Sequence, residues 1–148
     1  MTKKLSIAVF ALAAIVMVAG LIYVYYGISK SILVRDVMRD EKITYLLPRE
    51  EVERGSVMDT ADEAQKVADA IRAHRHTIAT TYDDLLKGKQ FDPTNTEHLT
   101  YSQAINLENY LYLGVTAFGL TTVVLINGIL LFFVGLALFL VGIIVRQL

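Results

Sequence analysis

Three histidines are the residues of this chain with the widest chemical range: His74, His76 and His98. Neutral imidazole is a common metal ligand and a common general base. His74 and His76 are two residues apart on a predicted helix, so they point about 200° apart and cannot chelate one metal together. His74 falls on the apolar face of that helix, and we expect it to be buried and hydrogen-bonded. A metal site that joins His74 or His76 to His98 or a carboxylate across a helical bundle is the less favoured alternative.

The acidic pairs offer no better catalyst. Asp83 and Asp84 point about 100° apart on a helix, and we expect side chains that are solvated or help to cap a neighbour rather than an acid–base dyad. The chain contains no cysteine, which excludes thiolate nucleophiles and iron–sulfur ligation. The sequence also lacks phosphate-binding loops, dinucleotide fingerprints, zincin motifs and nucleophile elbows. We therefore predict no catalytic, cofactor-binding or metal-binding residues, and a chain that is not an enzyme.

The elements that would position any site are dominated by two uncharged blocks. Hydrophobic residues make up 54% of the 148 residues and charged residues only 20%, which is more apolar than a typical soluble domain. No charged residue occurs over 5–29 or over 109–145. About 20 apolar residues suffice to cross ~30 Å of hydrocarbon. The blocks therefore predict two transmembrane helices, and the first is too long for the core of a cleaved signal peptide.

Charge orients these spans. All 15 acidic residues lie between them with 11 basic ones, whereas Lys3, Lys4 and Arg146 lie in the tails. Positively charged tails stay in the cytoplasm, so we expect a protein of the plasma membrane with both termini cytoplasmic and residues 30–108 outside. A net charge of −4 on the central segment argues against nucleic acid as a partner. The expected order is a tail over 1–4, transmembrane helix 1 over 5–28, an extracytoplasmic domain over 29–108, an outer stalk continuing into transmembrane helix 2 over 109–145, and a tail over 146–148.

Small residues recur every seven positions in both blocks: Ser6, Ala13, Gly20 and Gly27 in the first, and Gly114, Thr121, Gly128, Gly135 and Gly142 in the second. Seven residues return to nearly the same helix face, and small residues let two helices approach closely in lipid. We therefore expect an antiparallel hairpin, although the same face would suit a neighbouring subunit. Asn127 is expected to hydrogen-bond between helices. The predicted helix-packing residues are Ala13, Gly20, Gly27, Asn127, Gly128, Gly135 and Gly142.

The second block is longer than one crossing requires. At about 1.5 Å per residue it makes roughly 55 Å of helix, so residues 109–120 are expected to stand outside the bilayer. Their apolar side chains need cover, and a tilted or kinked span is the alternative. We expect that cover from a projecting continuation of the first helix through Ile32, Leu33, Val37 and Met38.

Between the blocks the pattern predicts a small helical domain. Thr60–Glu63 has the form of a capping box. Apolar residues then recur at three- and four-residue steps, which predicts one helix over about 61–87, ended by Gly88.

A second capping box, Thr100–Gln103, predicts another helix from about 101 that continues into the second span. The segment Glu41–Val57 stays open between a short strand and an extended chain, closed by Pro48. The expected fold class is an all-α membrane protein: an antiparallel two-helix transmembrane hairpin with projecting helices and a small extracytoplasmic helical domain.

Three stretches resemble a family of small two-span membrane proteins of bacteria, mostly actinobacteria and their neighbours. They are Arg39-Asp40-Glu41-Lys42-Ile43-Thr44, the alanine-containing Ala61–His74 with its Ile-x-x-His, and Thr81-Tyr82-Asp83-Asp84-Leu85. The resemblance covers most of the chain and implies no function. It departs before the Thr-Tyr pair, where relatives tend to have glycine and this chain has Ile78-Ala79-Thr80. Some members carry a dioxygenase label, but His74 and His98 as iron ligands would need a carboxylate that the sequence does not identify.

Three classes of function remain. The favoured one is a non-enzymatic structural or accessory protein that forms a homo-oligomer or joins a larger membrane complex through its glycine-rich helices and extracytoplasmic domain. The alternative is an extracytoplasmic ligand-binding or sensor module that acts through a partner, because the C-terminal tail holds no output domain. The least favoured is a metal-dependent enzyme that uses His74, His76 or His98. One polar residue in the spans makes a poor ion path.

Overall fold

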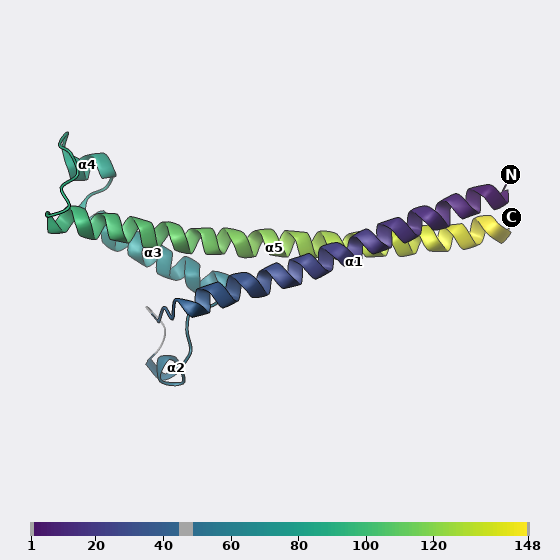
Figure 1. Cartoon of the computed structure of the whole chain (residues 1–148), viewed down its shortest axis with the longest axis horizontal. Helices are drawn as coiled ribbons and strands as arrows, with labels where there is room; N and C mark the ends of the chain where they lie inside the picture. The colour runs from purple at the N-terminus through teal and green to yellow at the C-terminus, as the bar shows by residue number, and fades with distance from the viewer. Residues whose placement is uncertain (1, 45–48, 148) are drawn as a thin grey trace. The chain divides into compact units, whose positions relative to one another are not determined.

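The computed structural model describes residues 2–44 and 49–147, and this part of the chain is helical with no strand. The helices are α1 (Thr2–Asp40), α2 (Arg49–Glu53), α3 (Ala61–Ile78), α4 (Tyr82–Leu86) and α5 (Thr96–Gln147) (Figure 1). Two compact units share them: the first unit comprises Met1–Leu33 and Gly119–Leu148, and the second unit comprises Val34–Phe118. The prediction of an all-α fold is confirmed.

The described residues of the first unit belong to α1 and α5. Both helices are long and apolar enough to cross a membrane. They run in opposite directions, because Gly142 lies against Phe10 and Gly27 lies against Leu125. The beginning of α1 is therefore beside the end of α5, as Figure 1 shows.

The second unit has a core drawn from the end of α1, from α3 and from the first half of α5. Small side chains at three- and four-residue steps put one face of α3 against its neighbours, since alanine lets helices approach closely. The loop residue Met58 is fully buried between them. The buried cluster is Met38, Met58, Ala64, Val67, Ala68, Leu111 and Phe118.

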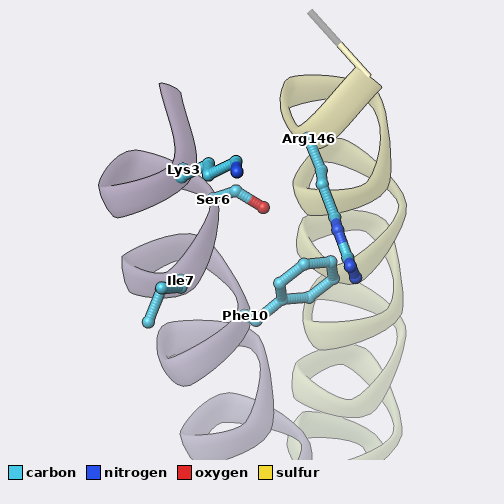
Figure 2. A pocket seen from close by; sticks show the side chains of 5 residues that line it. All are labelled: Lys3, Ser6, Ile7, Phe10 and Arg146. Carbon is cyan, nitrogen blue, oxygen red and sulfur yellow. The ribbon is translucent and has the colours of Figure 1, made fainter. Parts of the chain in front are cut away.

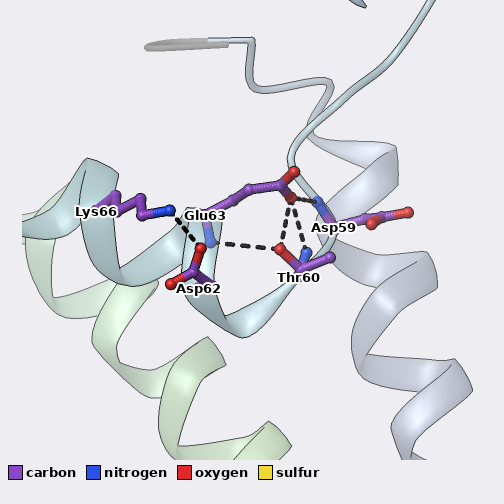
Figure 3. Close-up of polar contacts among 5 residues, drawn as sticks. All are labelled: Asp59, Thr60, Asp62, Glu63 and Lys66. Carbon is purple, nitrogen blue, oxygen red and sulfur yellow. Dashed lines mark hydrogen bonds and ion pairs between the residues drawn. The ribbon is translucent and has the colours of Figure 1, made fainter.

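The predicted capping box at the start of α3 is confirmed (Figure 3). The Thr60 hydroxyl accepts a hydrogen bond from the Glu63 backbone N–H at 3.3 Å and donates to the Glu63 carboxylate at 2.7 Å. That carboxylate also accepts the backbone N–H groups of Asp59 and Thr60, both at 3.2 Å. Because α3 begins with its free N–H groups satisfied, its first turn is fixed at Ala61.

The prediction of one helix over 61–87 is wrong, because α3 ends at Ile78 and α4 begins at Tyr82. Thr81 caps α4 with a second capping box, in which Asp84 takes the place of glutamate. This local pairing competes with continuation of α3 through the same residues. Gly88 lies just beyond α4 with φ of 73°, a left-handed conformation that suits glycine.

The predicted helix start near 101 is also wrong, because α5 begins at Thr96. The Asn95 side chain accepts hydrogen bonds from the backbone N–H groups of Glu97 at 2.9 Å and His98 at 3.3 Å. Asparagine is a strong N-cap residue, so it starts the helix before Thr100 is reached. Thr100 is an exposed residue inside α5.

The segment Glu41–Val57 is described only in part, and residues 45–48 of the expected strand or extended chain lie outside the described residues. Within this segment Arg49–Glu53 forms the short helix α2, which the sequence pattern did not predict. The Ile43 carbonyl accepts a hydrogen bond from the Met58 backbone N–H at 2.8 Å. That bond ties the end of α1 to the approach to α3.

The first helix does continue to Asp40. The prediction of which of its residues cover the apolar part of α5 is mostly wrong. Met38 is buried, and a Cβ added to Gly114 would lie 3.3 Å from its sulfur. Ile32, Leu33 and Val37 are instead about half exposed. Met38 and α3 together cover Leu111 and Phe118, because the alanines of α3 bring α3 close to α5.

Candidate functional site

The first unit is held by a line of buried small residues on each helix, called the seam here. On α1 the buried positions are Ser6, Ala13, Gly20 and Gly27, and on α5 they are Thr121, Gly128, Gly135 and Gly142. The residues between these positions are exposed or half-buried. A seven-residue period is the mark of a left-handed crossing, in which one narrow stripe of each helix meets the other.

Gly20 and Gly128 mark the closest approach of the two backbones. A Cβ built on Gly20 would lie 2.6 Å from the Phe132 backbone nitrogen, and one on Gly128 would lie 2.6 Å from the Val24 backbone nitrogen. A Cβ on Gly27 would lie 2.9 Å from the Leu125 Cα. Real Cβ atoms do not approach backbone this closely, so these positions accept only glycine unless the helices separate.

Toward the end of the seam where α1 begins and α5 ends, side chains fill the space beside the glycines. A Cβ on Gly135 would overlap Met17, and one on Gly142 would lie 2.8 Å from the Phe10 ring. The rings of Phe10 and Phe139 pack with centroids 5.2 Å apart. The buried Ser6 hydroxyl donates to the Gly142 carbonyl oxygen at 3.0 Å. Each glycine thus receives a neighbour's bulk in the place of its own side chain.

Asn127, which we expect to hydrogen-bond between helices, does not lie in the seam. Its side chain is exposed, and its amide donates to the Val123 carbonyl of the same helix at 2.9 Å. Adjacent residues on a helix point about 100° apart. Asn127 therefore faces away from the seam because the seam runs through the adjacent Gly128.

An open recess lies where the two helices begin and end (Figure 2). It is lined by Lys3, Ser6 and Ile7, by Phe10, and by Arg146 across from them, and its volume is about 430 Å³. Figure 2 shows the Arg146 side chain running back along α5 toward the level of Phe10. We call this feature the cationic recess.

The second unit contains a buried ion pair that sequence reasoning missed. The Arg75 guanidinium of α3 donates to the Glu108 carboxylate of α5 at 2.8 Å and also to the Tyr101 hydroxyl. The Arg75 and Glu108 side chains are only 8% and 7% exposed. The hydrogen bond from Glu108 raises the pKa of Arg75 above its ordinary value. Arg72 approaches the other Glu108 oxygen at 3.9 Å, so one carboxylate faces two guanidinium groups.

The hydroxyl groups of two α5 tyrosines differ in their hydrogen bonding. The Tyr112 hydroxyl donates to the Asp69 carboxylate at 2.6 Å, and this bond raises the pKa of Tyr112. Among the described residues, the buried Tyr110 hydroxyl has no hydrogen-bond partner. Burial raises its pKa as well.

The histidines do not meet. His74 and His76 are exposed on α3, so the expectation that His74 is buried is wrong. His98 is buried, its Nδ1 accepts the Asp92 backbone N–H at 3.1 Å, and its ring stacks on Phe91. In the described part of the chain, no group of three His, Asp or Glu residues could hold a metal ion. His98 thus fixes the turn before α5.

Comparison of the chain with protein-family models, with curated proteins and with solved structures gave no match. The resemblance drawn from its short motifs stays a prediction.

Proposed function

We propose that the first unit is a membrane-spanning hairpin. In the most apolar window of each of its helices only 17% of the residues are buried. A core helix of a soluble protein would bury most of such a window, whereas a lipid-facing helix leaves it to the acyl chains. The exposed side chains include Leu21, Leu130 and Ile144. This continuous apolar surface supports an integral membrane protein.

In this proposal the hairpin spans a plasma membrane. Both of its ends lie on the cytoplasmic side, and residues 30–108 lie outside. Lys3, Lys4 and Arg146 support that orientation through the preference of basic residues for the cytoplasmic side. The chain has no native cysteine, so Gln90→Cys should be labelled by a membrane-impermeant maleimide in intact cells. Lys4→Cys should be labelled only after permeabilisation. The reverse pattern would contradict the orientation.

The role that we propose is non-enzymatic: a structural or accessory protein that associates with itself or with a larger membrane complex. The observation that carries it is the exposed amide of Asn127 in an apolar helix. A primary amide has two N–H donors and an acceptor oxygen, and the bond to Val123 uses one donor. In hydrocarbon such a group is best satisfied by another helix.

The surroundings of Asn127 favour a second copy as the first partner to test. Leu120, Val134 and Val141 lie at seven-residue intervals from it and are all about half exposed or more. Such a stripe suits a second left-handed helix pair on the side of α5 that the seam does not use. In a parallel pair of chains the two Asn127 amides would meet, and each would supply what the other needs.

Asn127→Leu tests this association in the full chain, reconstituted in vesicles and counted by single-molecule photobleaching across a range of protein-to-lipid ratios. Interhelical amide bonds in membranes contribute about 0.6–2 kcal/mol, so the dissociation constant should rise roughly 3- to 30-fold. The matched control is Ile129→Leu, an exposed residue on another face of α5, which should change nothing. A native chain that remains monomeric at every density, and recovers no membrane subunit when captured in native lipid, would contradict the proposed role.

A further inference from the structure

The cationic recess brings together two basic residues from opposite ends of the chain. Lys3 belongs to the first turn of α1 and Arg146 to the last turn of α5. Figure 2 shows the Lys3 ammonium directed toward α5 at the level of Ser6, and the Arg146 guanidinium further along the hairpin, beside the Phe10 ring. A helical side chain leans toward the N-terminus of its own helix. Arg146 therefore leans inward along the hairpin and away from its cytoplasmic end.

No carboxylate side chain of the first unit neutralises these two cations. The acidic residue nearest to the N-terminus is Asp36 and the one nearest to the C-terminus is Glu108, and both belong to the second unit. The partial charges of the two helix ends, positive at α1 and negative at α5, largely cancel. Two positive side chains therefore remain at the recess without a carboxylate side chain of the first unit beside them, and both residues are exposed. Charges of one sign at an opening attract an anion.

The lining of the recess suits a small anion with an apolar attachment. The volume of the recess is about 430 Å³. Phe10 and Ile7 add apolar side chains to its lining. Arginine presents a fork that matches the oxygens of a phosphate, and lysine adds a point charge.

We propose that the cationic recess binds one phosphate group, with Lys3 and Arg146 as its ligands on facing helices. In the membrane orientation proposed above, on which the lipid source depends, the phosphodiester of an anionic phospholipid in the cytoplasmic leaflet supplies that group. Free inorganic phosphate has the same chemistry and is the other source. Its binding needs only the folded hairpin.

The test is native mass spectrometry of the full chain in a non-ionic detergent, titrated with phosphatidylglycerol, phosphatidylcholine or inorganic phosphate. We expect one phosphatidylglycerol per chain with about tenfold preference over phosphatidylcholine. Lys3→Gln and Arg146→Gln should each lower its affinity about five- to tenfold. The matched control is Lys4→Gln, which removes the same charge from an adjacent exposed residue that does not line the recess. It should lower the affinity less than twofold.

The lipid and phosphate arms separate the two sources. Displacement of phosphatidylglycerol by millimolar inorganic phosphate would support a site for the phosphate group itself, whereas no displacement would support a site that also needs the lipid's acyl chains. Equal binding of the two lipids, or equal losses for Lys4→Gln and Lys3→Gln, would overturn the proposal. The same spectra report the oligomeric state, so lipid binding and self-association are tested separately. A monomer that retains the lipid preference would support the recess and not the association.

Discussion

Gly128 and Gly119 lie nine residues apart on α5 and occupy opposite environments. A Cβ on Gly128 would lie 2.6 Å from the Val24 backbone nitrogen, whereas nothing lies within 4 Å of one on Gly119. Gly128→Ala should therefore destabilise the protein by about 1–3 kcal/mol, the usual cost of overpacking. Gly119→Ala should be neutral or stabilise it by up to about 1 kcal/mol through helix propensity.

Unfolding of the purified protein in mixed micelles, with increasing denaturing detergent, measures both variants against the native chain. Equal effects of the two alanines would mean that the backbones are not in contact at Gly128.

The Arg75–Glu108 pair predicts a strongly non-additive mutant cycle. Glu108→Leu leaves a buried guanidinium without its anion and should cost about 3–5 kcal/mol. Arg75→Met should cost less, because Arg72 remains 3.9 Å from the Glu108 carboxylate. The double variant, with apolar side chains of similar size, should recover most of the loss. Additive losses in chemical denaturation would contradict a coupled buried pair.

Tyr110 and Tyr112 form a matched pair with opposite expected effects. Tyr110→Phe removes a buried hydroxyl without a partner in the described chain and should stabilise by about 1 kcal/mol, whereas Tyr112→Phe removes a bond to a carboxylate and should destabilise by about 1.5 kcal/mol. The bond to Asp69 raises the pKa of Tyr112. Its contribution is therefore complete below the ordinary tyrosine pKa and is lost as pH rises through the raised value.

Denaturation at neutral and at strongly alkaline pH checks both statements. The difference between Tyr112→Phe and the native chain should shrink at alkaline pH. A difference that is independent of pH would contradict the assigned bond.

Short-range periodicity alone does not decide which residue of a helix is buried. Periodicity permits steps of three or four residues, and from Ile71 these lead to His74 or Arg75. The structure buries Arg75 because Glu108 and Tyr101 of α5 receive its guanidinium, and a partner 33 residues away leaves no local signal. Asn127 lies outside the seam, since adjacency to a seam glycine in sequence means a different face of the helix.

At the scale of the element, the capping box decides where α3 begins. Thr60→Ala removes the hydroxyl that bonds both the backbone N–H and the carboxylate of Glu63, and should cost about 1 kcal/mol. Thr77 lies in the last turn of the same helix, and its hydroxyl donates only to the His74 carbonyl. Thr77→Ala, as the matched control, should change stability by less than about 0.5 kcal/mol.

Amide hydrogen exchange locates the effect as well as its size. Protection should fall first at the N-terminal turn of α3 in Thr60→Ala. Unchanged protection there would mean that other contacts start the helix.

The boundaries of the elements were predictable only where a local side-chain bond could be recognised. The Thr60–Glu63 box has the standard form, which the sequence pattern predicts. The Thr81–Asp84 box has aspartate in place of glutamate, and Asn95 caps α5 by itself. Both signals were present in the sequence, but the long apolar pattern outweighed them. The short helix α2 has no cap or apolar period in the sequence that would have identified it.

At the scale of the whole molecule, two sequence features predict the two long helices and their packing faces: the length of the apolar blocks and the seven-residue period of small residues. Both features extend over many helical turns. An uncharged block well beyond 20 residues can be satisfied in few ways, and a seven-residue period fixes which face of each helix is available for close packing. The charges that line the recess come from sequence ends 143 residues apart, so only the pairing of α1 with α5 brings them together. No pattern in this chain's sequence identifies the partner for the exposed face around Asn127.

The pairing of α1 with α5 in the membrane is the central claim, and cross-linking in native membranes tests it most directly. The rings of Phe10 and Phe139 are 5.2 Å apart, and the chain has no cysteine of its own. A short bismaleimide should join Phe10→Cys to Phe139→Cys and hold the two halves together after cleavage at a protease site inserted at Lys89. Phe10→Cys with Leu120→Cys, about 28 Å further along α5, should give no link within one chain. Equal linkage of the two pairs, or linkage of the second pair alone, would contradict the seam.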